Sequence, residues 1–200
     1  LWAAGFDADS ISRMAREEDM FKLAKPWMPL FGTSKLTKLE RLLDRYIEGR
    51  DIEALPTRFA TVATDLDTGQ AVTLSTGSAV QAVLASASMP LRFDPVEIGN
   101  SRLVDGALVQ PVPISAAREL GAVYVLGIDV AYRPYEEPVD DYSDIKFQIF
   151  HIMVNQLIDE QMKRADLAIR LDVHEIMRDT SDMSGLIEAG EQAVDRAWPQ

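Results

Sequence analysis

The sequence predicts a layered α/β domain, because strand-like segments alternate with helix-like segments along the chain. Two observations carry this prediction. Residues 58–74 form two β-rich runs around the turn sequence Asp67-Thr68-Gly69, and residues 123–130 are almost entirely apolar, as in a strand covered on both faces. Segments 36–47 and 144–165 instead carry apolar residues at helical spacing. The order of these segments therefore indicates a sheet covered by helices.

The N-terminal part is predicted to be helical. Residues 1–5 resemble the last turn of a helix that glycine ends, so we expect the native chain to have further residues before Leu1. Asp7 and Asp9 can cap a helix over 10–20. The leucine-rich helix over 36–47 would stop at the glycine that follows it.

The middle and the C-terminal part alternate in type. The middle elements are predicted as strands over 58–64 and 70–74, a buried helix over 78–86 with Ser78 as its cap, a loop over 89–96 and a strand over 101–104. The later elements are predicted as a helix over 113–120, a strand over 123–130, a helix over 144–165, a strand over 167–171 and a closing helix over 185–198. The acidic, proline-rich segment 133–144 is interpreted as a solvated loop, because no cation-ligand spacing appears in it.

Composition narrows the classes of function. The 200 residues suit a single domain, 1–200, with a full hydrophobic core. A net charge of -12 argues against nucleic acid as a partner and against a purely electrostatic hold on anionic lipid. The absence of cysteine excludes disulfides and thiol nucleophiles, and it is compatible with the cytoplasm and equally with bacterial export.

Asp105 is the candidate catalytic residue. It ends a predicted strand and is followed by two tiny residues, Gly106 and Ala107. We expect Gly106 to take a backbone conformation closed to other residues, and the small side chains leave room for another group to approach the carboxylate. Strand ends in open α/β folds are also where ligands collect. The alternative is a turn aspartate that binds its own backbone, and local sequence leaves both interpretations open.

Several motifs in order resemble the patatin-like phospholipase family. They are Thr64-Asp65-Leu66-Asp67-Thr68-Gly69, Ala85-Ser86-Ala87-Ser88-Met89-Pro90, Phe93-Asp94-Pro95-Val96, Leu103-Val104-Asp105-Gly106-Ala107 and Pro111-Val112-Pro113. The resemblance covers roughly residues 1–130. It implies a three-layer α/β/α sandwich with a mixed, mostly parallel sheet, N-terminally truncated here.

The resemblance also implies a chemistry. Members use a serine–aspartate dyad, in which the aspartate of the Asp-Gly-Gly or Asp-Gly-Ala turn is the base for a serine nucleophile and a glycine-rich loop binds the oxyanion. Here that base would be Asp105. Met89, Pro90 and Phe93 would wall the acyl pocket, the substrate would be a lipid or other ester, and no metal or organic cofactor is implied.

The glycine-rich loop and the Gly-x-Ser-x-Gly elbow do not occur in the 200 residues, so we expect this segment alone to be inactive. Ser86 and Ser88 lack the flanking glycines of a nucleophile and are interpreted as helix-end and turn residues. His151 and His174 are interpreted as surface or packing residues. The rival hypotheses are a catalytically silent interaction or adapter module and, ranked last, a phosphate-binding α/β domain.

Two apolar segments exceed what one buried face requires. The helix over 144–165 is apolar on more than one face, so it is expected to be deeply buried or to form a homodimer contact or a lipid-facing patch. The segment 25–32, with Trp27, Met28, Leu30 and Phe31, is a second candidate patch or a core plug. Transient contact with a membrane surface would use such apolar surface.

Overall fold

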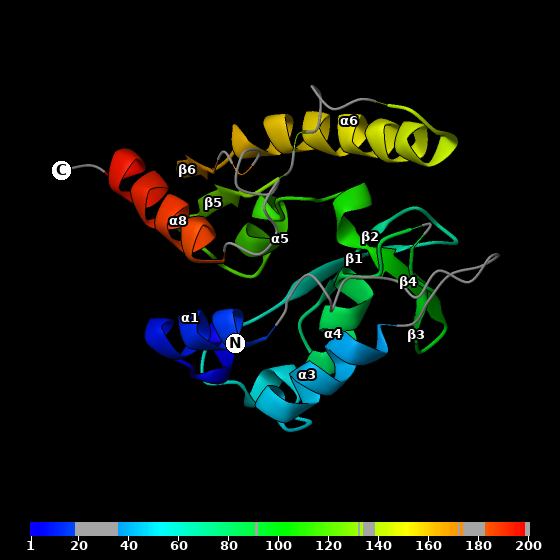
Figure 1. Cartoon of the computed structure of the whole chain (residues 1–200). Coiled ribbons are helices and arrows are strands. Elements are labelled where there is room, and N and C mark those ends of the chain that lie inside the picture. Colours follow the sequence, from blue (N-terminus) through cyan, green and yellow to red (C-terminus); the bar gives the residue numbers. More distant parts are fainter. Residues whose placement is uncertain are drawn as a thin grey trace. The chain divides into compact units, whose positions relative to one another are not determined.

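A computed structural model describes residues 1–18, 36–90, 92–131, 133, 139–171, 173 and 183–198 of the chain (Figure 1). The chain divides into two compact units, Leu1–Val109 and Gln110–Gln200. The predicted α/β class is confirmed, since both units combine helices with paired strands. The expectation of a single domain over 1–200 stays a prediction.

The first unit begins with helices whose ends follow local rules. The 3-10 turn η1 (Trp2–Ala4) ends at Gly5, which has φ 99°. Helix α1 (Ala8–Glu17) starts at the predicted cap, where the Asp7 carboxylate accepts the Ser10 N–H at 2.8 Å. Helix α3 (Thr37–Ile47) confirms the leucine-rich helix. The apolar segment 25–32, together with Gly32 to Ser34, lies outside the described residues.

Four antiparallel strands form the sheet of the first unit, in the order β2-β1-β4-β3. The strands are β1 (Thr61–Asp65), β2 (Ala71–Leu74), β3 (Val96–Ile98) and β4 (Ser101–Asp105). The expectation of a mostly parallel sheet is wrong for these strands. Tight turns join β1 to β2 and β3 to β4, the second through Gly99 and Asn100, and strands joined so closely run antiparallel. Strand β3 falls partly within the predicted loop over 89–96.

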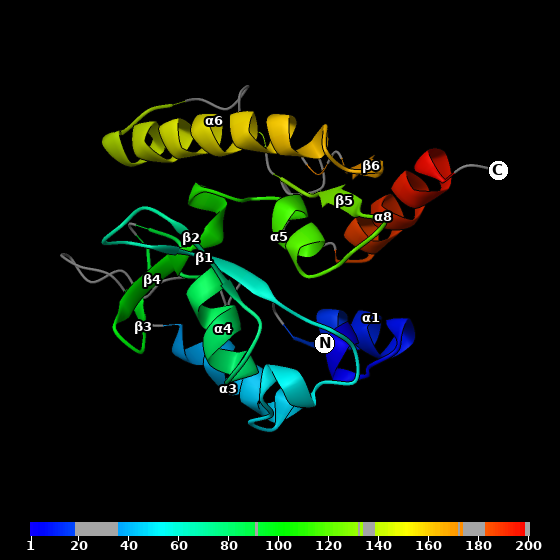
Figure 2. The same ribbon diagram turned by 180° about the vertical axis from the view of Figure 1, so that it is seen from behind.

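Helix α4 (Ala79–Ser86) packs against this sheet, as both views show (Figures 1 and 2). Ser78 caps it by accepting the Gln81 N–H, so the predicted cap is confirmed. The contact buries Ala85 of α4 against Ala63 and Leu103 of the two central strands. A second cluster joins α4 to α3 and to the short turn η2 (Ile52–Ala54) through Ile47, Ile52 and Val80. The sheet and α4 together make the core that positions Asp105.

The second unit contains a parallel strand pair. Its elements are α5 (Ile114–Glu119), β5 (Leu126–Asp129), α6 (Tyr142–Met162), β6 (Leu167–Arg170) and α8 (Met183–Ala197). Strands β5 and β6 pair in parallel, as a helical crossover between them requires. Its core joins Val112 and Ile114 to Ile158 and Met162 of α6. The predicted order helix, strand, helix, strand, helix is confirmed.

Strand β5 is not covered on both faces, contrary to the prediction. Gly127 faces α6, where a Cβ would lie 3.0 Å from Met162 Sδ. Residues on the opposite face alternate with it, and Leu126, Ile128 and Val130 are exposed there, Ile128 to 50%. Helix α8 packs against β6.

Helix α6 is partly exposed along its length. Its C-terminal half buries Ile158 and Met162, whereas Ile145, Ile149, Ile152 and Met153 of its N-terminal half are exposed. None of the helices in the described part of the chain is long and apolar enough to span a membrane.

Candidate active site

Asp105 stands at the junction of β4 and the short turn η3 (Gly106–Leu108). Its Oδ1 accepts a hydrogen bond from the Ala107 N–H at 2.8 Å. This is the self-bonded turn that the alternative interpretation expects. Its second carboxylate oxygen accepts no hydrogen bond from any described residue. The turn therefore orients the carboxylate through one oxygen and leaves the other available as a proton acceptor.

Burial raises the pKa of Asp105 above the ordinary aspartate value, and the hydrogen bond from Ala107 opposes this only in part. The cause lies in the sheet. Asp105 pairs with Ala63 on β1 and lies two residues after Leu103 on β4. Its side chain therefore starts from the same face of the sheet as theirs, which packs on α4. A carboxylate with a raised pKa is a stronger base than an exposed aspartate.

Gly106 is required because backbone approaches it closely. A Cβ at this position would lie 2.1 Å from the carbonyl oxygen of Val62 and 2.7 Å from its carbonyl carbon. The expectation that Gly106 adopts a conformation closed to other residues is wrong, since its φ is not positive. The missing side chain instead lets the turn after β4 press directly against β1.

Asp65 also ends a strand, but its carboxylate is committed to the β1–β2 hairpin. Its Oδ1 accepts the N–H groups of Asp67 and Thr68 at 3.0 and 2.9 Å and the Thr68 hydroxyl at 3.1 Å. Hydrogen bonds from the Ser101 hydroxyl and then from the Thr68 amide lower the pKa of Asp65. Asp65 is therefore a turn-forming residue, unlike Asp105.

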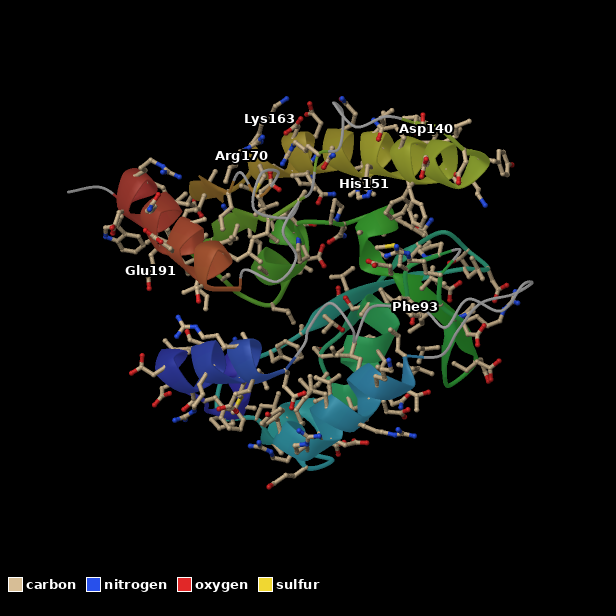
Figure 3. All side chains as sticks on the ribbon, in the orientation of Figure 1. Phe93, Asp140, His151, Lys163, Arg170 and Glu191 are labelled. Atoms are coloured by element: carbon tan, nitrogen blue, oxygen red, sulfur yellow. The ribbon has the colours of Figure 1, made fainter. Side chains whose placement is uncertain are left out.

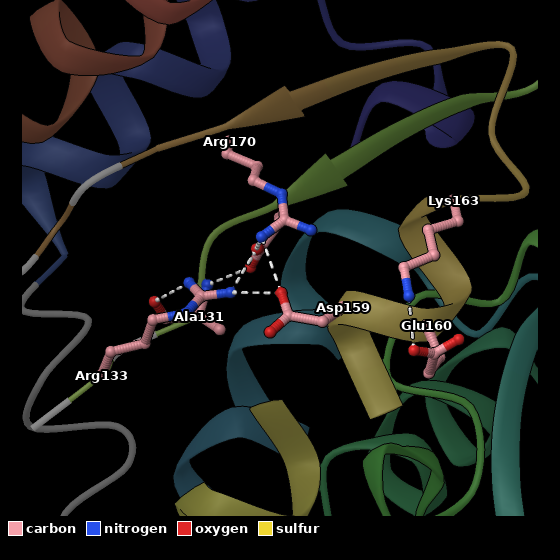
Figure 4. Close-up of polar contacts among 7 residues, drawn as sticks. Ala131, Arg133, Asp159, Glu160, Lys163 and Arg170 are labelled. Carbon is pink, nitrogen blue, oxygen red and sulfur yellow. Dashed lines mark hydrogen bonds and ion pairs between the residues drawn. The ribbon is translucent and has the colours of Figure 1, made fainter. Parts of the chain in front are cut away.

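Asp129 ends β5 and is 1% exposed, yet it lies beside the two arginines Arg133 and Arg170. Figure 4 shows that the side chains of these arginines also meet Asp159. The Oδ2 of Asp129 lies 2.6 Å from Arg133 Nη2 and 4.0 Å from Arg170 Nη1. Arg170 also donates to Asp159 at 2.7 Å. These contacts make Asp129 the centre of a structural ion-pair network. Of these three strand-end aspartates, Asp105 accepts the fewest hydrogen bonds from described residues, a single one from the Ala107 N–H.

The serines near Asp105 do not have the geometry of a nucleophile. Ser88 is 0% exposed, and its hydroxyl donates to the Leu84 carbonyl at 2.8 Å. Ser86 is the last residue of α4. The interpretation of both as helix-end and turn residues is confirmed.

The predicted acyl-pocket residues lie on the turn after α4. The Met89 carbonyl accepts the N–H of Arg92 at 3.2 Å and that of Phe93 at 3.0 Å. Phe93 is 7% exposed and lies among the side chains around α4 and the sheet (Figure 3). Met89 and Pro90 are half-buried. Their role as a pocket wall stays a prediction.

The histidines and the possible metal ligands give no further candidate for catalysis among the described residues. The ring of His151 contacts Phe150 edge to face at 5.9 Å, in keeping with a packing role, and His174 lies outside the described residues. The part of the chain that the structure describes contains no cluster of three or more His, Cys, Asp or Glu able to hold a metal ion.

A family model, "Patatin-like phospholipase", matches residues 2–118. This span exceeds half of the chain and contains both the β1–β4 pair and the Asp105 turn. The chain therefore belongs to the patatin-like phospholipase family.

Curated relatives of this chain include mycobacterial proteins. Uncharacterized NTE family proteins of Mycobacterium bovis and Mycobacterium tuberculosis are each 32% identical to it over 114 residues, which is 56% of this chain and 20% of theirs. Another uncharacterized NTE family protein of Mycobacterium bovis is 30% identical over 105 residues, 51% of this chain and 29% of its own length. The aligned segment thus spans less than a third of each of these relatives.

Sequence reasoning identified Asp105 but not the groups that hold its backbone. These are the Val62 carbonyl, which packs on Gly106, and the Thr64 hydroxyl, which donates to the Asp105 carbonyl at 2.9 Å. Both come from β1, about forty residues earlier in the chain. A buried threonine in a strand needs a hydrogen-bond partner, and this is the one signal that could have pointed to Thr64.

Proposed function

We propose that the full-length protein is a lipid acyl hydrolase of the phospholipase A or esterase type that uses a serine–aspartate dyad. Asp105 is its base, and the nucleophilic serine and the glycine-rich oxyanion loop come from polypeptide outside these 200 residues. The proposal rests on the family match together with one observation, the partly buried carboxylate of Asp105, which accepts a single hydrogen bond from the described residues and has a raised pKa.

The proposed mechanism has two stages. The serine hydroxyl attacks the ester carbonyl while Asp105 accepts its proton, and the proton then passes to the leaving alcohol. Asp105 next takes a proton from water, which attacks the acyl-enzyme, and then returns this proton to the serine oxygen as the fatty acid leaves, so that both residues regain their starting state. The raised pKa of Asp105 favours each proton transfer to it.

The complete domain is proposed to be a three-layer α/β/α sandwich with a mixed, mostly parallel sheet, to which the β5–β6 pair contributes parallel pairing. Met89, Pro90 and Phe93 are proposed to wall its acyl pocket. The apolar character of the three residues suits an acyl chain.

The test is hydrolysis of a chromogenic ester by the full-length protein and by its Asp105→Asn variant. Asparagine keeps the acceptor for the Ala107 N–H and removes the base, so we expect a loss of about a hundredfold or more in kcat. Asp65→Asn is the matched control at another strand end, and it should lower stability while each folded molecule keeps its turnover. Full activity of Asp105→Asn would exclude the proposed base.

A second candidate function is an interaction or adapter module, which the exposed apolar residues of α6 favour. Tyr142, Ile145, Ile149 and Ile152 follow a three-four-three spacing, as in the seam of paired helices. We propose that this stripe forms a homodimer contact or meets a lipid surface transiently. Reaction of the full-length protein with a fluorophosphonate separates the two functions, because an adapter without a nucleophile would stay unlabelled.

A further inference from the structure

The peptide units on both sides of Asp105 are held by groups outside its own strand. Its N–H donates to the Ser88 carbonyl, just after α4, at 3.0 Å. Its carbonyl accepts the Thr64 hydroxyl of β1 at 2.9 Å. Strand β3 pairs with β4 only as far as Leu103, so β3 does not supply these partners. The backbone of Asp105 is therefore fixed by β1 and by the end of α4.

Thr64 is the partner that acts through a side chain. It is 4% exposed, and its neighbour on β4 is Val104, which is also buried. A buried hydroxyl in such surroundings needs a partner, and among the described residues the Asp105 carbonyl accepts its hydrogen bond. The same peptide unit continues into Gly106, which rests on the Val62 carbonyl. Loss of the Thr64 hydroxyl would release this peptide on one side and let the carboxylate turn.

We propose that Thr64 is a positioning residue for the base Asp105, fixing the direction of its carboxylate by holding the Asp105 carbonyl. The proposal rests on the function proposed above. Catalysis depends steeply on such placement, because a displacement of about 1 Å can cost roughly a hundredfold in rate. Thr64 itself touches no reacting atom.

Thr61 provides a matched control on the same strand. Its hydroxyl also donates to a backbone carbonyl at 2.9 Å, but that carbonyl belongs to Ala82 of α4. Thr61→Val and Thr64→Val thus each remove one hydroxyl-to-carbonyl hydrogen bond and keep a similar shape. If kcat falls only in Thr64→Val, the loss comes from releasing the Asp105 carbonyl and not from removing a hydroxyl-to-carbonyl hydrogen bond as such.

The experiment measures kcat, KM and melting temperature for the full-length protein and four variants: Thr64→Val, Thr64→Ser, Thr61→Val and Asp105→Asn. We expect Thr64→Val to lower kcat by roughly tenfold to a hundredfold while KM stays within about twofold. Thr64→Ser keeps the hydroxyl and should recover kcat to within about threefold of wild type. Thr61→Val should keep wild-type kcat even though its melting temperature falls.

Each other outcome has a definite meaning. Wild-type kcat in Thr64→Val, or an equal loss in Thr61→Val, overturns the positioning role when Asp105→Asn is inactive. Failure of Thr64→Ser to recover activity in a folded protein overturns it as well. An active Asp105→Asn variant, or an inactive wild-type protein, refutes the proposed function and the positioning role with it.

Discussion

Replacement of Gly106 by alanine tests the close approach of the Asp105 turn to β1. The added Cβ would lie 2.1 Å from the Val62 oxygen, more than 1 Å inside the 3.4 Å at which ordinary contact begins. The Val62 oxygen and the Val62 carbonyl carbon, at 2.7 Å, are both backbone atoms, so no side-chain rotation can relieve the clash. β1 lies between β2 and β4, and its displacement would disturb both pairings.

The expected cost is about 3 kcal/mol or more, at the upper end of the usual range for overpacking. This is a large part of the roughly 5–15 kcal/mol that stabilises a typical domain. Urea unfolding followed by circular dichroism measures it. Gly190→Ala in α8 is the control, because its nearest atom would be a side-chain carbon at 3.7 Å. Alanine in a helix should stabilise there by about 0.5–1 kcal/mol.

A Gly106→Ala variant within about 0.5 kcal/mol of wild type would refute the close approach, since ordinary surface substitutions fall in that range. The same variant also bears on activity. Any shift that admits the Cβ moves Asp105, the preceding residue, so the folded fraction of Gly106→Ala should have a reduced kcat.

Three further predictions concern charge and surface. Burial raises the pKa of Asp105 above its value in the unfolded chain, so ionisation of Asp105 opposes folding as pH rises through the folded-state pKa. Asp105→Asn should therefore melt at a higher temperature than wild type at neutral pH, and this gain should disappear below the ordinary aspartate pKa. A lower melting temperature of the variant at neutral pH would contradict this. Asp129→Asn should lower the free energy of unfolding in urea by about 2–3 kcal/mol, because it breaks a buried charge-assisted pair with Arg133. Glu160→Gln, which breaks an exposed pair with Lys163, should lower it by less than about 1 kcal/mol. Equal losses would refute the structural role of the Asp129 network. Ile149→Lys should abolish a dimer seen by sedimentation equilibrium, while Gln192→Lys, at an exposed position of α8, should leave it intact. A dimer that survives Ile149→Lys does not use this stripe of α6.

Local signals in the sequence predicted the element ends well. The Asp7 and Ser78 caps and the turn at Gly69 depend on residues within a few positions of each other, so a single sequence contains what is needed. Gly99-Asn100 carries the same kind of turn signal and could have revealed the β3–β4 hairpin. An antiparallel sheet would then have been the expectation for the first unit.

Contacts distant in sequence could not be predicted in this way. The reason for glycine at 106 lies in the Val62 carbonyl of another strand, and Thr64 reaches the Asp105 carbonyl only through the β1–β4 register. The apolar run at β5 likewise does not say which face meets a helix: Gly127 faces Met162 of α6, whereas Ile128 is exposed. Sequence therefore indicated Asp105, and the structure distinguished it from Asp65.

We propose that Asp105 serves as base to a serine supplied by the rest of the full-length protein. The rate at which a fluorophosphonate labels that protein, followed by mass spectrometry with and without Asp105→Asn, tests this role. We expect one adduct on a serine outside these 200 residues, formed far more slowly in the variant. An unlabelled wild-type protein, or equal labelling rates in both, would contradict it.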